Sequence, residues 1–235
     1  MNICLLGYGK MGKEIEAIAL QRGHNIVLKV DETNASTFTN EDLKNADVAI
    51  EFSTPDTVIG NIKKCFETQV PVVVGTTGWY NEFEMIQELC LQKSSALFHA
   101  TNFSLGVNLF FKINSYLAEL MNKYNSYEVE MEEIHHIHKL DKPSGTAISL
   151  ANQVLEKIER KKNWSITEHN PETLFIKDVR NGEVPGTHII KYSSEVDDIE
   201  IMHKAHSRKG FALGAIIAAE YINGKKGIFT MNDLI

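Results

Sequence analysis

A glycine-rich loop between a predicted strand and a predicted helix constrains this chain more than any other feature of its sequence. Residues 2–6 form a short apolar run, and residues 10–22 carry apolar side chains at helical spacing. The loop between them has the spacing GxGxxG, which permits a tight turn, a close approach of a pyrophosphate to the backbone, and close packing of the helix on the strand. We therefore expect a dinucleotide to bind at the N-terminus of this helix. The expected contact residues are Gly7, Tyr8, Gly9, Lys10, Met11 and Gly12.

A carboxylate at the end of the next predicted strand bears on the choice of cofactor. Asp31 follows residues 26–30, where a carboxylate accepts hydrogen bonds from the adenosine ribose of NAD and repels the 2′-phosphate of NADP. A shift of one residue would give this role to Glu32. Lys29 or Lys10 is able to bind the phosphate of NADP, so the residues favour NADH and leave NADPH open.

The first hundred residues alternate short apolar runs with helical patterns. Because each crossover between parallel strands must traverse a face of the sheet, this alternation predicts an α/β fold, a Rossmann-like doubly wound parallel sheet with both faces covered. Further strands are expected at residues 47–52, 70–74 and 96–99, and further helices at residues 56–67 and 80–92.

Two polar segments follow the fourth and fifth predicted strands. They stand at the carboxyl ends of parallel strands, where ligands bind in open α/β sheets. Each segment is alternatively a plain strand-to-helix turn, but two such loops at one edge favour contact with the nicotinamide half of the cofactor. The residues expected there are Gly75, Thr76 and Thr77 in the first segment, and Ala100, Thr101, Asn102 and Phe103 in the second.

The pattern changes near residue 102, where strands with alternating polar and apolar residues become frequent. This pattern predicts a second, α+β domain with a mixed sheet that helices cover on one side. Residues 211–221 form an apolar, alanine-rich helix that needs a sheet face to cover, so we assign residues 1–101 and 210–235 to a dinucleotide-binding domain and residues 102–209 to the second domain. In this part of the chain, strands are expected at residues 127–134, 175–180, 187–193 and 199–204, and helices at residues 106–124 and 144–160.

Charge and cysteine content exclude several classes of protein. The chain of 235 residues has 31 acidic and 24 basic residues, a formal net charge of −7, which argues against general nucleic-acid binding because that function needs a basic face. Its three cysteines are far apart and include no CxxC pair, so we expect neither disulfides nor a zinc–cysteine site. We read no signal peptide and no membrane span, and we expect a cytoplasmic protein without a membrane partner.

Residues 133–146, between a predicted strand and a predicted helix, hold the densest chemistry of the chain. Three histidines and two lysines concentrate positive charge here in an otherwise acidic protein. Ser144 is placed to cap the helix that follows, and Gly145 and Thr146 would offer free backbone N–H groups to a carboxylate. We therefore expect this loop to bind a small molecule that carries one or two carboxylates.

Three other interpretations of this loop compete with substrate binding. Its histidines and glutamates invite a metal ion, but neighbouring side chains of a strand point to opposite faces and no cysteine accompanies them, so we predict no metal. The loop is alternatively a solvated basic segment without function, or some of its histidines merely brace it, an interpretation that we apply to His138. The residues that invite a metal are Glu132, Glu133, His135, His136 and His138, with His203 and His206 from a distance.

Residues 133–147, EIHHIHKLDKPSGTA, resemble the E-x-H-H-x-x-K-x-D-x-P-S-G-T-A signature of the 4-hydroxy-tetrahydrodipicolinate reductases, also called dihydrodipicolinate reductases. The signature is long and specific. The GTTG and A-x-N-F-S-x-G-V-N segments of the family are similar to residues 75–78 and 100–108, and its C-terminal pattern is similar to residues 206–208 and 211–215. The resemblance spans nearly the whole chain.

The resemblance implies an oxidoreductase that uses NADH or NADPH to reduce a small cyclic dicarboxylate in the biosynthesis of diaminopimelate and lysine. It further implies a homotetramer that forms through the second domain, which thus becomes the substrate-binding and oligomerisation domain. By position, Lys139 matches the proton donor of the family, His135 matches a catalytic donor or acceptor, and His136 matches a substrate-binding histidine. The segment of the family that binds a substrate carboxylate through its backbone corresponds to Ser144, Gly145 and Thr146. The cofactor site of the family corresponds to the glycine loop, Asp31, residues 75–77 and residues 100–103.

Two departures from the family pattern and two rival functions stay open. Lys10 stands where many members have arginine, and the segment 33–46 is shorter than in many members, so the resemblance does not decide between NADH and NADPH. One rival is another two-domain dehydrogenase, acting on an amino acid or a sugar, which would not need the histidine–lysine loop. The other is a non-catalytic dinucleotide sensor, which would lack a proton donor such as Lys139.

Overall fold

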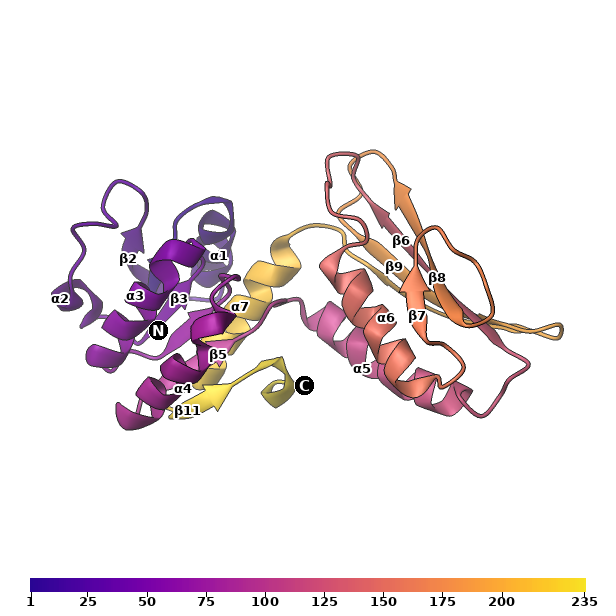
Figure 1. Ribbon diagram of the computed structural model, residues 1–235. Coiled ribbons are helices and arrows are strands. Elements are labelled where there is room, and N and C mark those ends of the chain that lie inside the picture. Colours follow the sequence, from indigo (N-terminus) through magenta and orange to yellow (C-terminus); the bar gives the residue numbers. More distant parts are fainter. The chain divides into compact units, whose positions relative to one another are not determined.

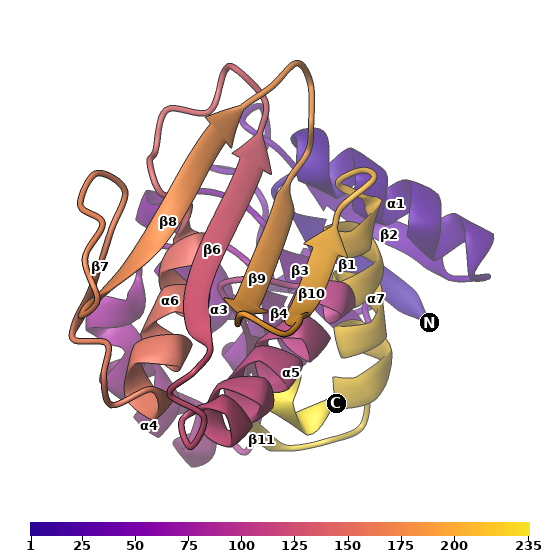
Figure 2. The same ribbon diagram turned by 90° about the vertical axis from the view of Figure 1, so that its right-hand side faces the viewer.

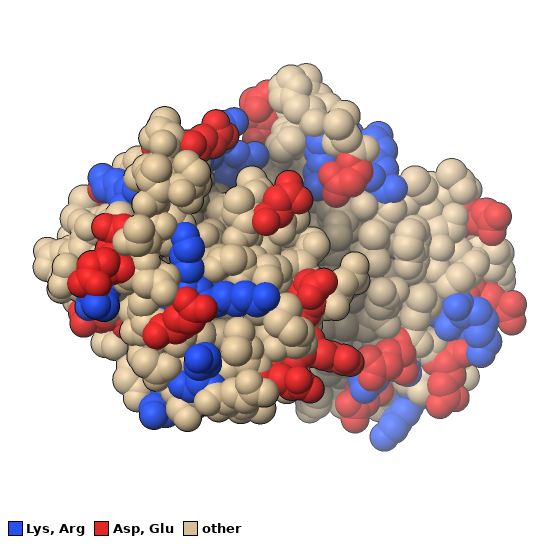
Figure 3. Space-filling model, turned by 60° about the vertical axis from the view of Figure 1, so that its left-hand side comes forward, with Lys and Arg blue, Asp and Glu red and all other residues tan.

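A computed structural model describes residues 1–235, and the chain divides into two compact units (Figure 1). The first unit comprises Met1–Leu105 and Lys209–Ile235, and the second comprises Gly106–Arg208. The first boundary falls after Leu105 rather than after residue 101, because Phe103 is buried in the core of the first unit. Lysine and arginine side chains are interspersed with aspartate and glutamate on the face shown in Figure 3.

The first unit contains a six-stranded parallel sheet with the strand order β11-β5-β4-β3-β1-β2. In this order β1, which leads into the glycine loop, lies between β3 and β2. The order confirms the predicted doubly wound parallel arrangement. The strands are β1 (Asn2–Leu6), β2 (Asn25–Val30), β3 (Val48–Glu51), β4 (Val72–Val74), β5 (Ala96–His99) and β11 (Gly227–Phe229).

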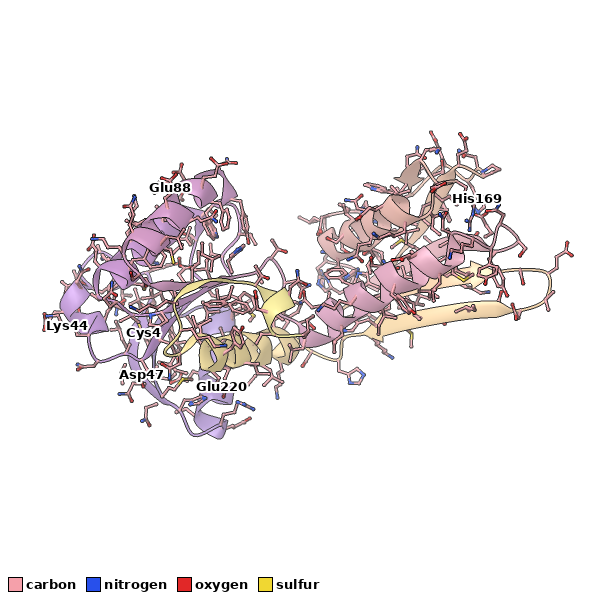
Figure 4. The ribbon with its side chains drawn as sticks, turned by 90° about the horizontal axis from the view of Figure 1, so that it is seen from below. Cys4, Lys44, Asp47, Glu88, His169 and Glu220 are labelled. Carbon is pink, nitrogen blue, oxygen red and sulfur yellow. The ribbon has the colours of Figure 1, made fainter.

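Helices cover both faces of this sheet, which explains why its strands are apolar on both sides. Ile3 and Leu5 of β1 pack with α1 (Lys10–Gln21) and α7 (Lys209–Ile222), whereas Cys4, labelled in Figure 4, and Leu6 pack with α3 and α4 on the other face. Glu220 of α7 accepts hydrogen bonds from Arg22 and His24 just beyond α1, and these contacts hold the two helices side by side. The helices of the second face are α3 (Pro55–Glu67) and α4 (Phe83–Gln92).

The second unit contains a five-stranded mixed sheet with the order β10-β9-β6-β8-β7 (Figure 2). The central strand β6 pairs antiparallel with β9 and parallel with β8, as the predicted mixed sheet requires. Two helices, α5 (Leu105–Met121) and α6 (Gly145–Lys157), pack on one face through a shared apolar core. The strands are β6 (Glu128–His135), β7 (Asn163–Ser165), β8 (Thr173–Arg180), β9 (Thr187–Ser193) and β10 (Asp198–Lys204).

Short elements are the main departures from the predicted secondary structure. The structure adds α2 (Asn40–Leu43), β7 and β11, and it ends the helix expected at residues 144–160 at Lys157. Elements of three or four residues show too little periodicity to be recognised, and they form because neighbouring strands or caps stabilise them. Single 3₁₀ turns lie at Tyr80–Glu82 and Met231–Asp233. None of the helices combines the length and the apolarity needed to cross a membrane.

Candidate active site

The glycine loop of the first unit contains two glycines that the backbone geometry requires and one with open space beside it. Gly7 has a φ of 102°, and a Cβ atom there would overlap the carbonyl oxygen of Phe52. A Cβ atom on Gly12 would overlap the carbonyl oxygen of Gly7. Gly9 is different, because nothing lies within 4 Å of the position of its missing Cβ. The outer glycines therefore shape the turn, and the middle one keeps the backbone accessible.

The N-terminus of α1 follows this loop and has the properties of an anion site. Gly9 is the N-cap residue, without a side-chain capping hydrogen bond, and the first turn of the helix contains no acidic residue. The first backbone N–H groups of a helix have no partner within the helix and carry partial positive charge. These residues fit the pyrophosphate of a dinucleotide, with Lys10 exposed and Met11 partly buried beside it.

A cavity of about 280 Å³ lies at the carboxyl ends of β3 and β4, beside the first turn of α1. It brings together Met11 of the glycine loop and the predicted GTTG segment, and Thr76 Oγ1 accepts a hydrogen bond of 2.8 Å from the backbone N–H of Ser53. A Cβ atom on Gly75 would lie 2.1 Å from the ring of Phe52, so a side chain at this position would have to displace that ring. The segment after β3 was not predicted as part of this site, although its position at the end of a central strand was a signal for it. The lining residues are Met11, Phe52, Ser53, Pro55, Gly75, Thr76 and Thr77.

Asp31 is exposed directly after β2 and accepts two hydrogen bonds from Thr33, 2.8 Å from its backbone N–H and 2.6 Å from its hydroxyl. These hydrogen bonds lower the pKa of the Asp31 carboxyl, so the group is an ionised acceptor at neutral pH. Of the two lysines predicted to bind a phosphate, Lys10 is exposed and Lys29 is paired with an acidic side chain. Lys29 Nζ lies 2.5 Å from Glu16, whose carboxylate also accepts a hydrogen bond from the hydroxyl of Tyr8.

Phe103 is a core residue of the first unit. Its side chain is 2% exposed, and its ring lies 5.5 Å from the ring of Phe52 and 5.8 Å from that of Phe98. A Cβ atom on Gly214 of α7 would overlap the carbonyl oxygen of Phe103. The side chain of Phe103 is therefore committed to packing, and a cofactor would meet the backbone of this segment.

The rest of this segment, after β5, is more accessible. Ala100 is partly buried, Thr101 is exposed, and the carboxamide oxygen of Asn102 accepts a hydrogen bond of 2.9 Å from the backbone N–H of Ser104. This hydrogen bond fixes the turn that leads into α5. Ala100, Thr101 and Asn102 are thus the parts of the segment with surface that a ligand is able to reach.

In the second unit, Glu133 and His135 lie on the same buried face of β6, because alternate residues of a strand share a face. Glu133 Oε2 lies 3.2 Å from His135 Nδ1. His188 of β9 stands opposite Glu133 in the sheet register, and its Nε2 atom lies 3.6 Å from the same carboxylate oxygen. The two imidazole rings meet edge to face, with their centroids 5.2 Å apart.

Ser144 connects this buried group to helix α6. Its hydroxyl accepts a hydrogen bond of 3.1 Å from the backbone N–H of Ala147, which confirms the predicted N-cap. Its backbone N–H donates a hydrogen bond of 2.8 Å to Glu133 Oε1, and its hydroxyl lies 3.2 Å from His188 Nε2. Strands β6 and β9 and the beginning of α6 therefore meet at one carboxylate.

The surroundings of Glu133 decide its charge. Burial alone raises the pKa of a carboxyl, but donors from His135, His188 and Ser144 outweigh burial and lower the pKa of Glu133 below its ordinary range. Burial lowers the pKa of His188, opposed by its contact with Glu133. At neutral pH the cluster therefore holds an ionised carboxylate surrounded by N–H donors.

The N-terminus of α6 presents the second predicted anion site. Gly145 is exposed, nothing lies within 4 Å of the position of its missing Cβ, and the first turn contains no acidic residue. Thr146 is partly buried beside it. The free N–H groups of this turn suit a carboxylate of a bound molecule.

Lys139 lies in the loop between β6 and α6 and pairs with Asp141, a contact that was not predicted from the sequence. Its Nζ atom donates hydrogen bonds of 2.8 Å to each carboxylate oxygen of Asp141, which lower the pKa of that carboxyl. Arg180 of β8 anchors the loop by donating a hydrogen bond of 2.8 Å to the backbone oxygen of Asp141. The ammonium group is thus held by a neighbouring carboxylate, and the Lys139 side chain is about one-fifth exposed.

The remaining histidines of the loop do not converge with His135. His136 is partly buried, and its Nδ1 atom is buried without a hydrogen-bond partner. His138 is exposed and lies 3.2 Å from Glu183, as the bracing interpretation expects. The group with the geometry of metal ligands is instead Glu133, His135 and His188, whose donor atoms all lie within 4.8 Å of one another.

The parallel sheet with its glycine loop, and the mixed sheet with its buried acid–imidazole cluster, define a two-domain dinucleotide-dependent oxidoreductase. Residues 1–103 match the family described as dihydrodipicolinate reductase, N-terminus, and residues 106–235 match the family described as dihydrodipicolinate reductase, C-terminus. The chain belongs to the dihydrodipicolinate reductase family.

Curated relatives and solved structures agree with this assignment. A 4-hydroxy-tetrahydrodipicolinate reductase of Christiangramia forsetii is 49% identical over 100% of this chain and 98% of its own. The enzyme of the same name from Neisseria meningitidis serogroup B is 33% identical over 94% of this chain and 83% of its own. The dipicolinate-bound dihydrodipicolinate reductase from Paenisporosarcina sp. TG-14 has the same fold, with a TM-score of 0.80, 22% identity and 99% of each chain covered.

Proposed function

We propose that this protein reduces 4-hydroxy-tetrahydrodipicolinate, or the dihydrodipicolinate formed from it, to tetrahydrodipicolinate with NADH or NADPH, a step in the biosynthesis of diaminopimelate and lysine. The observation that carries the proposal is the loop between β6 and α6. It holds an ammonium group at Lys139 and an open helix N-terminus at Gly145. Full-length similarity to curated reductases of this name supports the same conclusion.

In this proposal the bound dinucleotide supplies a hydride, and the protein supplies the proton and the binding sites. The backbone N–H groups of Gly145 and Thr146 bind one substrate carboxylate, with His136 as a further contact. Lys139 gives its proton to the ring nitrogen on which negative charge develops, and Asp141 positions the ammonium group through their ion pair. His135 acts as proton donor or acceptor when the 4-hydroxyl leaves as water.

The residues that fit the cofactor accept both dinucleotides, with an advantage for NADH. The ionised Asp31 carboxylate suits a ribose diol and opposes a 2′-phosphate. Lys29 is engaged by Glu16, which reduces its value to a phosphate. We expect kcat/KM for NADH to equal or exceed that for NADPH, as measured with both cofactors at one ionic strength.

We also propose a cytoplasmic homotetramer that assembles through the second unit. Along α5, four large apolar side chains on one helical face are about half exposed or more, an arrangement that a partner surface would cover. All three cysteines are free and buried, which suits a reducing compartment. Light scattering should give four times the chain mass of 26.5 kDa, and a monomer would contradict the assembly. The exposed side chains are Leu109, Ile113, Tyr116 and Leu120.

The decisive experiment follows the near-ultraviolet absorbance of reduced cofactor with substrate freshly prepared from pyruvate and aspartate semialdehyde. We expect loss of absorbance that requires both substrate and protein. Cofactor binding without turnover would instead indicate a dinucleotide sensor. Turnover of a different acid, with none of this substrate, would indicate another dehydrogenase.

A further inference from the structure

A buried carboxylate without an obvious catalytic task lies beneath the proposed substrate site. Glu133 is 0% exposed, and its two oxygens face different elements, Oε1 the N-terminus of α6 and Oε2 the imidazoles of His135 and His188. An ionised carboxylate in such a place is costly unless donors surround it. The presence of an ionised Glu133 in the core therefore suggests that its charge has a function.

The first part of that task concerns His135. Glu133 Oε2 and His135 Nδ1 are both buried and neither has a hydrogen-bond partner, although they lie only 3.2 Å apart, so each is the nearest group that could pair with the other. Because an ionised carboxylate only accepts hydrogen bonds, it selects the imidazole tautomer that carries its proton on Nδ1. The lone pair of the neutral ring is then on Nε2, the atom needed for proton exchange.

The glycine at residue 186 supports this orientation. His135 Nε2 lies 3.1 Å from the position that a Cβ atom of Gly186 would occupy, closer than an ordinary contact. Gly186 also has a φ of 156°, at the margin of the region that favours glycine. The Nε2 edge of the ring is thus free of a side chain from the turn before β9.

The second part of the task concerns α6. The hydrogen bond of 2.8 Å from the backbone N–H of Ser144 to Glu133 Oε1 ties the N-cap residue to β6. His188 adds a contact of 3.2 Å to the hydroxyl of the same serine. The N–H groups of Gly145 and Thr146 follow directly, so the carboxylate that orients the imidazole also holds the turn that receives the substrate.

We propose that Glu133 is a positioning residue that fixes the Nδ1–H tautomer of His135 and, with His188, anchors the substrate-binding N-terminus of α6. The inference rests on the proposed function for the identity of the reaction. The tautomer itself is a property of the free protein. The titratable groups that face Glu133 are His135 and His188, with Lys139 and Asp141 acting on the cluster through their charges.

The test compares Glu133→Gln with Glu132→Gln. The first variant keeps the shape and the acceptor for Ser144 but removes the charge. The second is a matched control, because Glu132 directly precedes Glu133 in β6, points to the other face of the sheet and pairs with Lys177 at 3.1 Å. Two readouts are combined: the ¹⁵N shifts of the His135 ring at a pH where it is neutral, and the pH profile of kcat with KM for the substrate.

We expect Nδ1–H in the natural protein and a shift toward Nε2–H in Glu133→Gln. We also expect kcat to fall at least about tenfold, because acid–base groups contribute about 10² to 10⁴ to rate. The acid limb of the pH profile should move and KM for the substrate should rise, whereas KM for the dinucleotide and every property of Glu132→Gln should stay unchanged. If Glu133→Gln does not fold, the ring shifts of the natural protein still decide.

Two results would overturn the proposal. One is an Nε2–H tautomer of His135 in the natural protein. The other is a stoichiometric divalent cation held by Glu133, His135 and His188, detected by adding Co²⁺ and observing d–d absorption bands that Glu133→Gln loses; the cluster would then be a metal site. A natural protein with the expected tautomer but no turnover would contradict the proposed function alone.

Discussion

Each unit of this molecule buries one glutamate on a central strand, and the two carboxylates have opposite chemistry. Glu51 ends β3, and its partners are the neutral amide of Asn61, at 3.1 Å, and the hydroxyl of Ser53. Burial raises the pKa of Glu51, with those hydrogen bonds opposing the rise. Glu133 instead faces two imidazoles and a backbone N–H group, and its pKa is lowered.

The difference matches how the two proposed sites bind. In the first unit the groups offered to a ligand are mostly backbone, and the buried glutamate is one hydrogen-bonding group among neutral ones that hold the loops. In the second unit the buried carboxylate is ionised, and in the proposed mechanism charged side chains carry out the proton transfer. Substitutions that change volume should therefore damage the first site most, and substitutions that change charge should damage the second.

Removal of the ammonium group of Lys139 tests the second half of this contrast and should have the largest effect. Lys139→Ala should lower kcat about a hundredfold or more, the usual scale of general acid catalysis, while dinucleotide binding persists. Lys142→Ala is the matched control, since Lys142 belongs to the same loop but pairs with Asp178 at 3.3 Å. Near-normal turnover of Lys139→Ala would remove Lys139 from the proposed role.

Substitutions that add volume in the glycine loop test the prediction for the first unit, that its site is sensitive to changes of volume. Gly7→Ala should lower the free energy of unfolding by about 2–4 kcal/mol, because the new Cβ overlaps the backbone of Phe52 at a positive φ. Gly9→Ala should leave stability nearly unchanged, because its Cβ would meet nothing within 4 Å, but should weaken dinucleotide binding. Urea unfolding and dinucleotide titration of both variants separate the two effects. Equal losses of stability would contradict the division between shaping and binding glycines.

The pH dependence of stability compares the two glutamates directly. A carboxyl whose pKa is lowered in the folded protein stabilises the fold at pH values above its ordinary pKa of 4.5, and this contribution is lost as the pH falls. Glu133→Gln should therefore lower the free energy of unfolding by about 1.5–3 kcal/mol at pH 7 and by less below pH 4.5. A carboxyl whose pKa is raised in the folded protein stabilises the fold below pH 4.5, and this contribution is lost as the pH rises. Glu51→Gln should therefore leave the free energy of unfolding at pH 7 unchanged or increase it. Urea unfolding from pH 4 to pH 8 measures both. Parallel curves for the two variants would remove the distinction.

Asp31 is the expected exception in the first unit, a charged side chain that acts on the ligand. Asp31→Ala should weaken NADH binding about tenfold, the value of one hydrogen bond to a charged group, and should leave NADPH binding unchanged or improved. Glu32→Ala is the control for the alternative register. If only the Glu32 variant loses NADH affinity, the ribose contact belongs one residue later.

The sequence predicted those features that local patterns encode. The alternation of strands and helices, the glycine loop and the N-cap at Ser144 depend on neighbours within a few residues. The Glu133–His188 contact joins residues far apart in the chain, and only the register between β6 and β9 brings them together. Alternation did carry one unused signal, since Glu133 and His135 fall at positions of β6 that point into the core.

Two further features depend on contacts that the sequence pattern does not show. Phe103, predicted as a cofactor contact because it follows a strand end at which ligands bind, has its side chain packed against the rings of Phe52 and Phe98. Asp141 is only two residues from Lys139, yet the turn that joins their charges was not apparent from composition. The assigned roles of the individual site residues stay predictions until the variants above are measured.

The path of the chain has a consequence for biosynthesis. The first unit needs α7 and β11, which come from the last residues of the chain, and seven residues of α7 are buried against it. A nascent chain that emerges from the ribosome therefore completes the second unit while the first still lacks α7, one of the two helices on one sheet face, and an edge strand. Until residues 209–235 have emerged, the part of this apolar face that α7 covers stays open to chaperones or to wrong partners, and loss of these residues should cause aggregation.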